Sequence, residues 1–377
     1  MIAFFCRTPM HVFRTVQLKL ELYPNESCKI FVFDTFPGSK EMCERIKNTG
    51  LFEDVLFFCD SDYLKRGKAS ELRTTIESSG FKSYLKNEYY DEIYLYNVYG
   101  AFNELIFNVL HKKNKNLIVN MVEDGPSIYH IESYDKGFFR RYVYSLIGLE
   151  SYLENIDYWW FSKPELMDPL YNGEKKELPS IDKTNKQMVD AINFVFAYDY
   201  DSTIAKADFL IMEECYWNDG LMPGNDDYQL FMQLKKEYND KKIVVKLHPR
   251  TKVNRFKRDF DTVEANGIPW EVYALNMEME NKILVSLSCA TMISSKLLYG
   301  EETFSLLLYP IIEDRIIVKD TGEKYLTEDR KRKIDSQAKL YVDGSKFVKA
   351  KTVDQAIKTL NNWLTRCGVK NENQKND

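Results

Sequence analysis

The sequence predicts an α/β protein with two domains, each built around a parallel β-sheet. Three observations lead to this fold class. The 377 residues are too many for one typical hydrophobic core and suit two. Short apolar runs alternate with amphipathic stretches through the first half of the chain, and the same alternation starts again near Ala207. Because strands that alternate with helices form a parallel sheet covered on both faces, we expect domains at 1–200 and 201–350, with a closing helix and disordered tail at 351–377.

The first domain is expected to alternate strands and helices up to about residue 122. Its first helix has two start signals, since Thr8 is a good N-cap and Pro9 suits the first helical position. The expected strands are 2–6, 28–33, 54–59, 92–96 and 116–122, and the expected helices are 9–22, 39–48, 68–86 and 102–112. Further along we expect a helix at 137–153, a strand at 156–162 and a linker at 164–186.

The second domain repeats this pattern. Its expected strands are 208–212, 242–246, 270–272, 283–287 and 304–309, and its expected helices are 226–238, 291–299 and 353–365. The last ten residues have no apolar period and are expected to be disordered. Two such domains in tandem form a cleft, and ligands of open parallel sheets bind beyond the carboxyl ends of the strands. The residues that directly follow each strand are therefore the candidates for function.

Composition places the chain among ordinary globular proteins and excludes several functions. Hydrophobic residues make up 44% and charged residues 29%, and a net charge of −5 with no basic face argues against nucleic acid as a partner. Seven cysteines without a Cys-x-x-Cys pair predict free thiols, a reducing compartment and no metal cluster. No apolar run approaches the roughly 18 residues of a membrane span, and the apolar start lacks the basic region of a signal peptide. We expect a cytoplasmic protein; the basic run 330–333 leaves open a weak contact with the inner face of the cell membrane.

Two strand ends carry carboxylates followed by glycine. Glu123 and Asp124 come after the expected strand 116–122, and Asp219 lies in the loop after the expected strand 208–212. A carboxylate at the edge of a cleft can accept the proton of a hydroxyl group during transfer. Asp-Gly sequences are also good turns, so each motif alone has two interpretations.

A third strand end brings together basic groups. Lys246 ends the expected strand 242–246, and His248, Pro249 and Arg250 follow it after Leu247. A single histidine is most often structural. Here the two neighbouring cations and the rigid proline favour a site for an anion.

A fourth strand end is rich in small polar residues. Ser288, Cys289 and Thr291 lie between an expected strand and an expected helix, where such residues cap the helix or leave N–H groups for a phosphate. Glu271 could hold two ribose hydroxyls, and its alternative interpretation is a solvated carboxylate on an edge strand. Together the strand ends supply a base, donors for a leaving phosphate and a ribose-binding acid, which is what transfer from a nucleotide sugar needs.

These residues resemble glycosyltransferase family 52, the bacterial sialyltransferases that act on lipooligosaccharide and capsule. The family's motifs occur here in the same order over most of the chain. They are Glu123-Asp124-Gly125, Asp219, His248-Pro249-Arg250, Glu271 and Ser288, and the opening Phe5-Cys6-Arg7-Thr8-Pro9 looks like the family's first strand and turn.

The resemblance implies a GT-B fold whose second domain holds the donor. It implies CMP-sialic acid as the donor, no other cofactor and no metal, and a terminal galactose of a bacterial surface glycan as the acceptor, in α-2,3 linkage. Asp219 becomes the general base, and His248 stabilises or protonates the departing phosphate. The nucleotide is held by the remaining candidates, with Glu271 at the ribose, Ser288 at the phosphate, and Lys246, Pro249, Arg250, Cys289 and Thr291 around them. A homodimer is left open.

Two positions depart from the sialyltransferase pattern. A related family uses the acid of the Asp-Asp-Gly motif as its base, which would be Asp124 here; we favour Asp219. Where a pair of hydroxyl residues is common, this chain has Ser288 followed by Cys289, and the true pair Ser294-Ser295 ranks second.

Three other functions are weighed against this one. A metal-dependent transferase would place its metal on Asp60-Ser61-Asp62 or Asp199-Tyr200-Asp201, although such triplets arise easily in loops. A transferase of the same kind could use a glucose or Kdo nucleotide as the donor. A protein of a different class would bind a nucleotide or glycan without turnover.

Overall fold

The computed structural model describes residues 1–59, 70–77, 79–96, 102–125, 144–167, 173–264 and 267–373. The chain divides into two compact units, Met1–Tyr198 with Gly267–Val272, and Asp199–Asn266 with Tyr273–Asp377. Within the described residues, each unit contains one parallel sheet, of seven and six strands. The predicted fold class, α/β and GT-B-like with two Rossmann-like parallel-sheet domains, is confirmed. The cleft expected between the two units stays a prediction.

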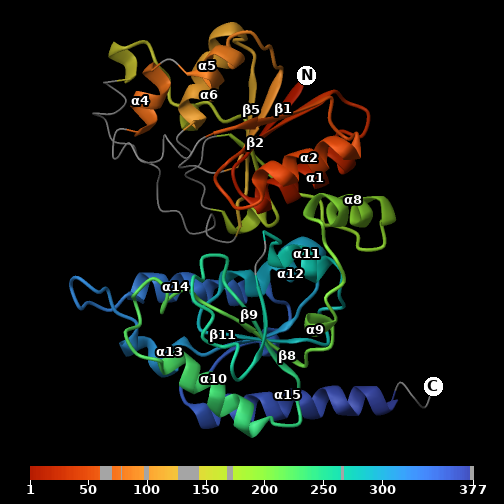
Figure 1. Cartoon of the computed structure of the whole chain (residues 1–377), viewed down its shortest axis with the longest axis vertical. Helices are drawn as coiled ribbons and strands as arrows, with labels where there is room; N and C mark the ends of the chain where they lie inside the picture. Colours follow the sequence, from red (N-terminus) through yellow and green to blue (C-terminus); the bar gives the residue numbers. More distant parts are fainter. Residues whose placement is uncertain are drawn as a thin grey trace. The chain divides into compact units, whose positions relative to one another are not determined.

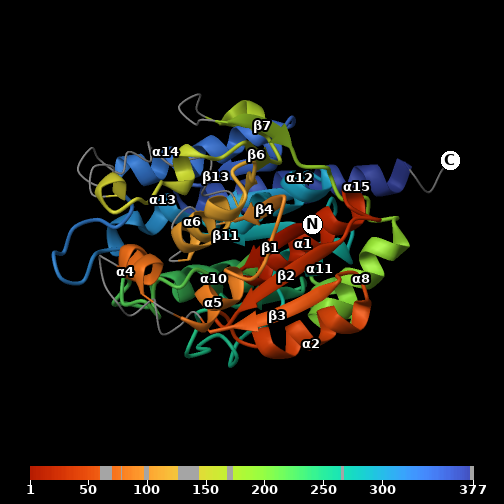
Figure 2. The same cartoon turned by 90° about the horizontal axis from the view of Figure 1, so that it is seen from above.

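The first sheet has the strand order β3-β2-β1-β4-β5-β6-β7. Its strands are β1 (Ile2–Cys6), β2 (Cys28–Phe33), β3 (Asp54–Phe58), β4 (Glu92–Leu95), β5 (Ile118–Val122), β6 (Tyr158–Phe161) and β7 (Glu174–Glu177). The order reverses between β1 and β4, which pair directly with Ile2 opposite Glu92 (Figure 2). The loops after two such strands leave the sheet in opposite directions, and the crevice between them is where open sheets of this kind bind ligands.

The helices of the first unit form two groups of neighbours (Figure 1). One group is α1 (Pro9–Glu21), α2 (Ser39–Thr49) and α8 (Lys186–Phe196), and the other is α4 (Ser70–Ile76), α5 (Gly80–Leu85) and α6 (Asn103–Lys113), with short 3₁₀ turns at Tyr152–Glu154 and Pro164–Leu166. Helix α1 begins as expected, because the Thr8 hydroxyl accepts the N–H of His11 (3.2 Å) and Pro9 occupies the first turn. This fixes the chain directly after β1.

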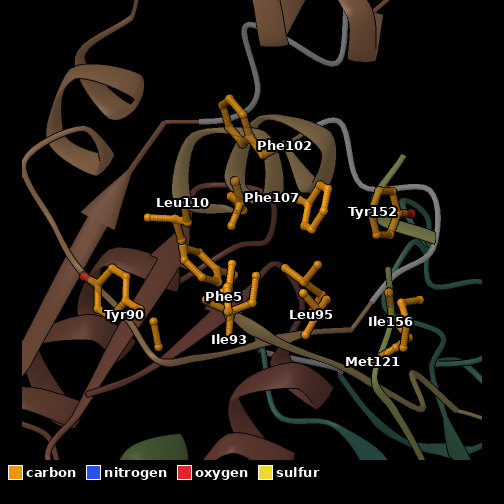
Figure 3. Close-up of a cluster of buried hydrophobic side chains, with 14 of the residues drawn as sticks. Phe5, Tyr90, Ile93, Leu95, Phe102, Phe107, Leu110, Met121, Tyr152 and Ile156 are labelled. Atoms are coloured by element: carbon orange, nitrogen blue, oxygen red, sulfur yellow. The ribbon is translucent and has the colours of Figure 1, made fainter. Parts of the chain in front are cut away.

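A cluster of buried apolar side chains holds α6 against the first sheet (Figure 3). Phe107 and Leu110 of α6 meet Ile93 and Leu95 of β4, and Phe5 of β1 belongs to the same cluster. Side chains alternate between the two faces of a strand. The neighbouring Phe4 accordingly stacks on Tyr94 (centroids 4.7 Å apart) away from this cluster. Both faces of this part of the sheet are thus apolar.

The second sheet has the order β10-β9-β8-β11-β12-β13. Its strands are β8 (Phe209–Met212), β9 (Ile243–Lys246), β10 (Asp261–Val263), β11 (Ile283–Ser286), β12 (Phe304–Leu307) and β13 (Phe347–Lys349). This is the order of the first six strands of the other unit, so the reversal lies between β8 and β11, which pair with Met212 opposite Ser286. The loops after β8 and β11 therefore flank the expected ligand-binding crevice of this unit.

The second unit is covered by both long and very short helices (Figure 1). They are α9 (Ser202–Ala205), α10 (Asp226–Glu237), α12 (Ser294–Tyr299), α13 (Tyr309–Ile312), α14 (Glu328–Ser336) and α15 (Val353–Asn373), with 3₁₀ turns at Ala290–Ile293, Glu313–Arg315, Gln337–Leu340 and Gly344–Lys346. Helix α11 (Trp270–Leu275) belongs to this unit from Tyr273 onward, while its first three residues group with the first unit. Phe209 of β8 packs on Tyr238 at the end of α10, and Phe304 of β12 stacks on Trp363 of α15. No helix of the described segments is long and apolar enough to cross a membrane.

Several expected elements were wrong. Residues 270–272, expected as a strand, begin helix α11. The expected linker 164–186 contains strand β7, the single helix expected at 68–86 is divided into α4 and α5, and the helix expected at 291–299 is a 3₁₀ turn followed by α12. Helix α15 extends to Asn373, into the tail that was expected to be disordered. Of the helix expected at 137–153, residues 137–143 lie outside the described residues, and residues 147–151 are turn and loop rather than helix.

Candidate functional site

The loops after β8 and β11 are joined by hydrogen bonds to one carboxylate. The Oε1 atom of Glu214 accepts the backbone N–H of Ser288 (3.2 Å) and the Ser288 hydroxyl (3.0 Å). The same hydroxyl lies 2.5 Å from the phenol oxygen of Tyr216. Ser288, a sequence candidate for phosphate binding, therefore lies at the reversal point of the second sheet with its two donors directed at an acid.

The turn that carries Ser288 is fixed by its own polar groups. The Ser286 hydroxyl donates to the carbonyl of Met212 (2.7 Å) and accepts the N–H of Cys289 (3.2 Å). Cys289 Sγ lies 2.7 Å from Thr291 Oγ1. These bonds hold the three small residues predicted from sequence in one turn, directly across from the end of β8.

A second acid holds the His-Pro-Arg segment after β9. Glu213 is only 2% exposed, and its Oε2 accepts the N–H of His248 (3.0 Å) and the hydroxyl of Thr251 (2.6 Å). Burial raises the pKa of the Glu213 carboxyl. The two consecutive acids after β8 thus bind the loops on either side of that strand, Glu213 toward β9 and Glu214 toward β11.

The imidazole of His248 is neutral at physiological pH. Burial lowers the pKa of His248 to about 4, and the positive charges of Arg250 and Lys246 lower this pKa further while Asp219 opposes them. Its Nδ1 accepts the N–H of Arg250 (3.1 Å), so the proton of the neutral ring resides on Nε2. His248 therefore presents an N–H donor to a ligand.

The remaining basic groups of this segment lie in different surroundings. Arg250 is 66% exposed and forms an ion pair with Asp219 (3.0 Å). Lys246 is the last residue of β9 and is 5% exposed, with its ammonium group over the Tyr273 ring (5.4 Å). Pro249 is exposed in the turn between them. Two sequence candidates, Asp219 and Arg250, are thus in direct contact, and Lys246 is a buried cation behind His248.

Glu271 and the serine pair differ from expectation. Glu271 lies in the first turn of helix α11, not after a strand, and is buried, so the alternative of a solvated edge-strand carboxylate is wrong. It belongs to the segment Gly267–Val272 that groups with the first unit, and its role at the ribose stays a prediction. Ser294 and Ser295 begin α12 and are both buried.

The first unit has a separate cluster at its own reversal point. Asp124, two residues beyond β5, has a side chain that is 26% exposed, and its Oδ1 lies 2.9 Å from Nε2 of His11. The His11 ring is buried in the first turn of α1 and stacks on Tyr96 (centroids 4.7 Å apart). Its Nδ1 accepts the N–H of Arg7 (3.0 Å), which leaves the proton on the nitrogen that faces Asp124.

The neighbouring acid Glu123 has a structural environment. Glu123 and Arg14 are each 1% exposed and form a buried ion pair. Ser162 completes it, with its N–H donated to Glu123 Oε2 (2.8 Å) and its hydroxyl 2.7 Å from the Arg14 guanidinium. Of the two adjacent acids predicted from sequence, Asp124 is the one that solvent or a ligand can reach.

The metal-binding alternative gains no support from the described residues. No group of three or more His, Cys, Asp or Glu side chains that could hold a metal ion occurs among them. The triplet Asp60-Ser61-Asp62 lies outside the described residues.

Sequence reasoning missed Glu213, Glu214 and His11. The two glutamates were detectable, because an acidic pair directly after an apolar strand is out of place in a core and lies at the ligand-binding edge. His11 occupies a buried position of an amphipathic helix, and no sequence signal distinguishes it from a histidine that packs in the core.

A family model described as alpha-2,8-polysialyltransferase (POLYST) matches residues 60–308, well over half of the chain. The chain belongs to the alpha-2,8-polysialyltransferase family. This membership confirms the coarser part of the resemblance, a glycosyltransferase of the sialyltransferase type, while assignment to family 52 stays a prediction. Comparison with curated proteins gave no match.

Solved structures with a similar chain trace are distant in sequence from this polysialyltransferase family member. UDP-GlcNAc 2-epimerase from Methanocaldococcus jannaschii is 14% identical with a TM-score of 0.47, over 96% of this chain and 98% of that chain. Arabidopsis thaliana UGT89C1 complexed with quercetin is 11% identical with a TM-score of 0.48, over 95% and 87%. The S. aureus MnaA-UDP co-structure is 12% identical with a TM-score of 0.41, over 91% and 87%. At these values the likenesses carry nothing about activity.

Proposed function

We propose that this family member is an inverting sialyltransferase that uses CMP-sialic acid as its donor. The family membership supports the sialyl part of the proposal. The observation that carries the nucleotide part is the cluster at the reversal point of the second sheet, where Ser288 and His248 supply neutral hydrogen-bond donors beside the cation Arg250. Such donors stabilise the charge that develops on a departing phosphate.

In the proposed reaction the acceptor hydroxyl oxygen attacks the anomeric carbon of sialic acid. The bond from that carbon to the phosphate oxygen breaks, its electron pair stays on CMP, and a carboxylate receives the proton of the hydroxyl. His248 acts as a neutral donor to the phosphate, because a pKa of about 4 leaves almost no imidazolium at neutral pH to serve as an acid. Arg250 adds positive charge, and Glu271 is retained as the proposed ribose ligand.

Two carboxylates compete for the role of base. Asp219 was favoured by the sequence and is paired with Arg250, so it would have to exchange that partner when it receives a proton. Asp124 faces the Nε2 atom of His11, whose Nδ1 accepts the backbone N–H of Arg7. These surroundings strengthen Asp124 as the alternative to Asp219.

Two acceptors follow from different observations. The motif resemblance favours a terminal galactose of a bacterial surface glycan, joined through an α-2,3 linkage. The family description instead names an α-2,8 linkage and a polysialic acid product, which requires a terminal sialic acid as the acceptor. We place the α-2,8 acceptor first, since the family match rests on 60–308 and the galactose expectation rests on short motifs.

The experiment measures free nucleotide released from a panel of donors, namely CMP-sialic acid, CMP-Kdo and UDP-glucose, each with an oligosialic acid or a galactoside as acceptor. The proposal expects CMP release that depends on the acceptor, with CMP-sialic acid alone among the donors. Linkage of the product is read by nuclear magnetic resonance. Nucleotide release from UDP-glucose or CMP-Kdo, and not from CMP-sialic acid, would assign a different donor. Nucleotide binding without release from any donor would favour a binding protein. Association with the membrane surface and with a second copy of the chain stay proposals.

A further inference from the structure

The acid Glu214 lies in the second unit beyond the carboxyl end of β8, where open sheets of this kind bind ligands. It directly follows Glu213 at the end of β8, beside the reversal point of the sheet. Its Oε1 accepts the two donors of Ser288, the N–H and the hydroxyl. A carboxylate oxygen bound by a backbone N–H and a serine hydroxyl has the hydrogen-bonding environment of a phosphate oxygen.

The hydrogen bonds of Glu214 differ in role from those of the neighbouring acid, Glu213. Glu213 is almost fully buried, and its hydrogen bonds fix the loop after β9. Glu214 is only partly buried, and the turn after β11 is already held by Ser286, which bonds Met212 and Cys289. The turn therefore has anchors of its own besides the Glu214 contact.

We propose that Glu214 fills the phosphate-binding donors of Ser288 when no nucleotide is bound, and that binding of the CMP phosphate is coupled to the uptake of one proton by Glu214. This inference rests on the proposed function, because it takes the nucleotide phosphate to bind at Ser288. When a phosphate takes the two donors of Ser288, the Glu214 carboxylate loses these hydrogen bonds and lies beside another negative charge. Both changes favour the protonated form of Glu214. The proton comes from solvent, and the neutral carboxyl group can then donate to a phosphate oxygen.

The surroundings of Glu214 allow this exchange near neutral pH. Burial raises the pKa of Glu214 to about 7, the Ser288 bonds oppose this rise, the negative charge of Glu213 adds to it and the positive charge of Arg250 opposes it. Burial also raises the pKa values of the neighbouring Glu213 and Cys215. Burial raises the pKa of Tyr216 far above neutrality, and His248 titrates near pH 4.

The consequence is a specific pH dependence of affinity. Above pH 7 the free Glu214 is increasingly ionised, so the affinity for CMP should fall by up to about tenfold per pH unit. The second ionisation of a phosphate lies near pH 6, and His248 titrates lower still, so between pH 7.5 and 9 the fall reports on Glu214. Glu214→Gln keeps an acceptor for Ser288 but carries no charge, and it should bind CMP about tenfold more tightly than the wild type at pH 8.

Calorimetry of CMP binding at pH 8, in buffers of different ionisation enthalpy, tests the proposal. The wild type should take up close to one proton with CMP and none with cytidine, which lacks the phosphate. Glu214→Gln should lose this uptake. The exposed control Glu280→Gln, which makes the same chemical change elsewhere in the second unit, should keep it.

Several outcomes would overturn the inference. Wild-type CMP binding without proton uptake contradicts it whatever the variants do, and so does equal uptake in Glu214→Gln. In both cases CMP still binds, so the proposed function survives. If neither CMP nor cytidine binds the wild type, the proposed nucleotide site itself is wrong and the Glu214 inference is wrong with it.

Discussion

The contrast between the adjacent acids Glu123 and Asp124 gives a sharp prediction about stability. Replacing Glu123 by Ala leaves the Arg14 guanidinium buried without its carboxylate partner, still bonded to Gln17 and Ser162. Removing one member of a buried ion pair costs about 3–5 kcal/mol. Asp124→Asn changes a partly exposed group beside His11, and we expect its cost to stay below about 1 kcal/mol.

Hydrogen exchange of peptides from β1 and β5 is the appropriate assay, because it reports on the first unit without assuming that the whole chain unfolds in one step. The loss of stability expected for Glu123→Ala corresponds to amide hydrogen exchange that is faster on the order of a hundredfold or more. A double variant with Arg14→Met and Glu123→Leu should recover most of the loss, since a matched apolar pair often replaces a buried ion pair without penalty. Equal exchange in Glu123→Ala and Asp124→Asn would refute the division of these acids into a structural and an accessible one.

Three further predictions concern the proposed donor site and the proposed reaction. The pKa of His248 is lowered to about 4 in the folded state from an unfolded value near 6.5. Between these two pH values the unfolded state binds more protons, so the stability of the fold should fall as the pH falls from 6.5 to 4. Urea unfolding of the wild type and His248→Asn checks this, and identical pH profiles of the two proteins would contradict it. Of Asp219→Asn and Asp124→Asn, the variant that removes the base should slow turnover on the order of a hundredfold with little change in KM for CMP-sialic acid; wild-type rates in both would exclude both residues as the base. EDTA should leave the transfer rate unchanged, and a loss that Mg²⁺ or Mn²⁺ restores would show that a metal is required.

Much of the architecture could be predicted because its strands are short, apolar and well separated. The strand that ends at Cys6 and the helix that begins at Pro9 follow from local signals alone, namely an apolar run, an N-cap and a proline. The same logic located the strands before His248 and Ser288. Once the strand ends were known, the rule that ligands bind there identified residues that the structure brings into contact, such as Asp219 with Arg250.

The elements that were missed have weak or ambiguous local patterns. β10 and β13 have only three residues each, which is too short to show a period, and β7 is the charged edge sequence Glu-Lys-Lys-Glu. The run from Trp270 to Leu275 is apolar in most positions, and a short apolar run fits a strand as well as a buried helix. The partners of Glu213 and Glu214 lie in other loops, so their hydrogen bonds depend on strand order, which the sequence does not specify locally.

The central claim is that the nucleotide phosphate binds at the reversal point of the second sheet. A crystal structure with CMP tests it most directly. We predict a phosphate oxygen within hydrogen-bonding distance of both the N–H and the hydroxyl of Ser288, with Nε2 of His248 directed at the phosphate and Glu214 moved off Ser288. A phosphate bound elsewhere, with the contact between Glu214 and Ser288 intact, would contradict the account.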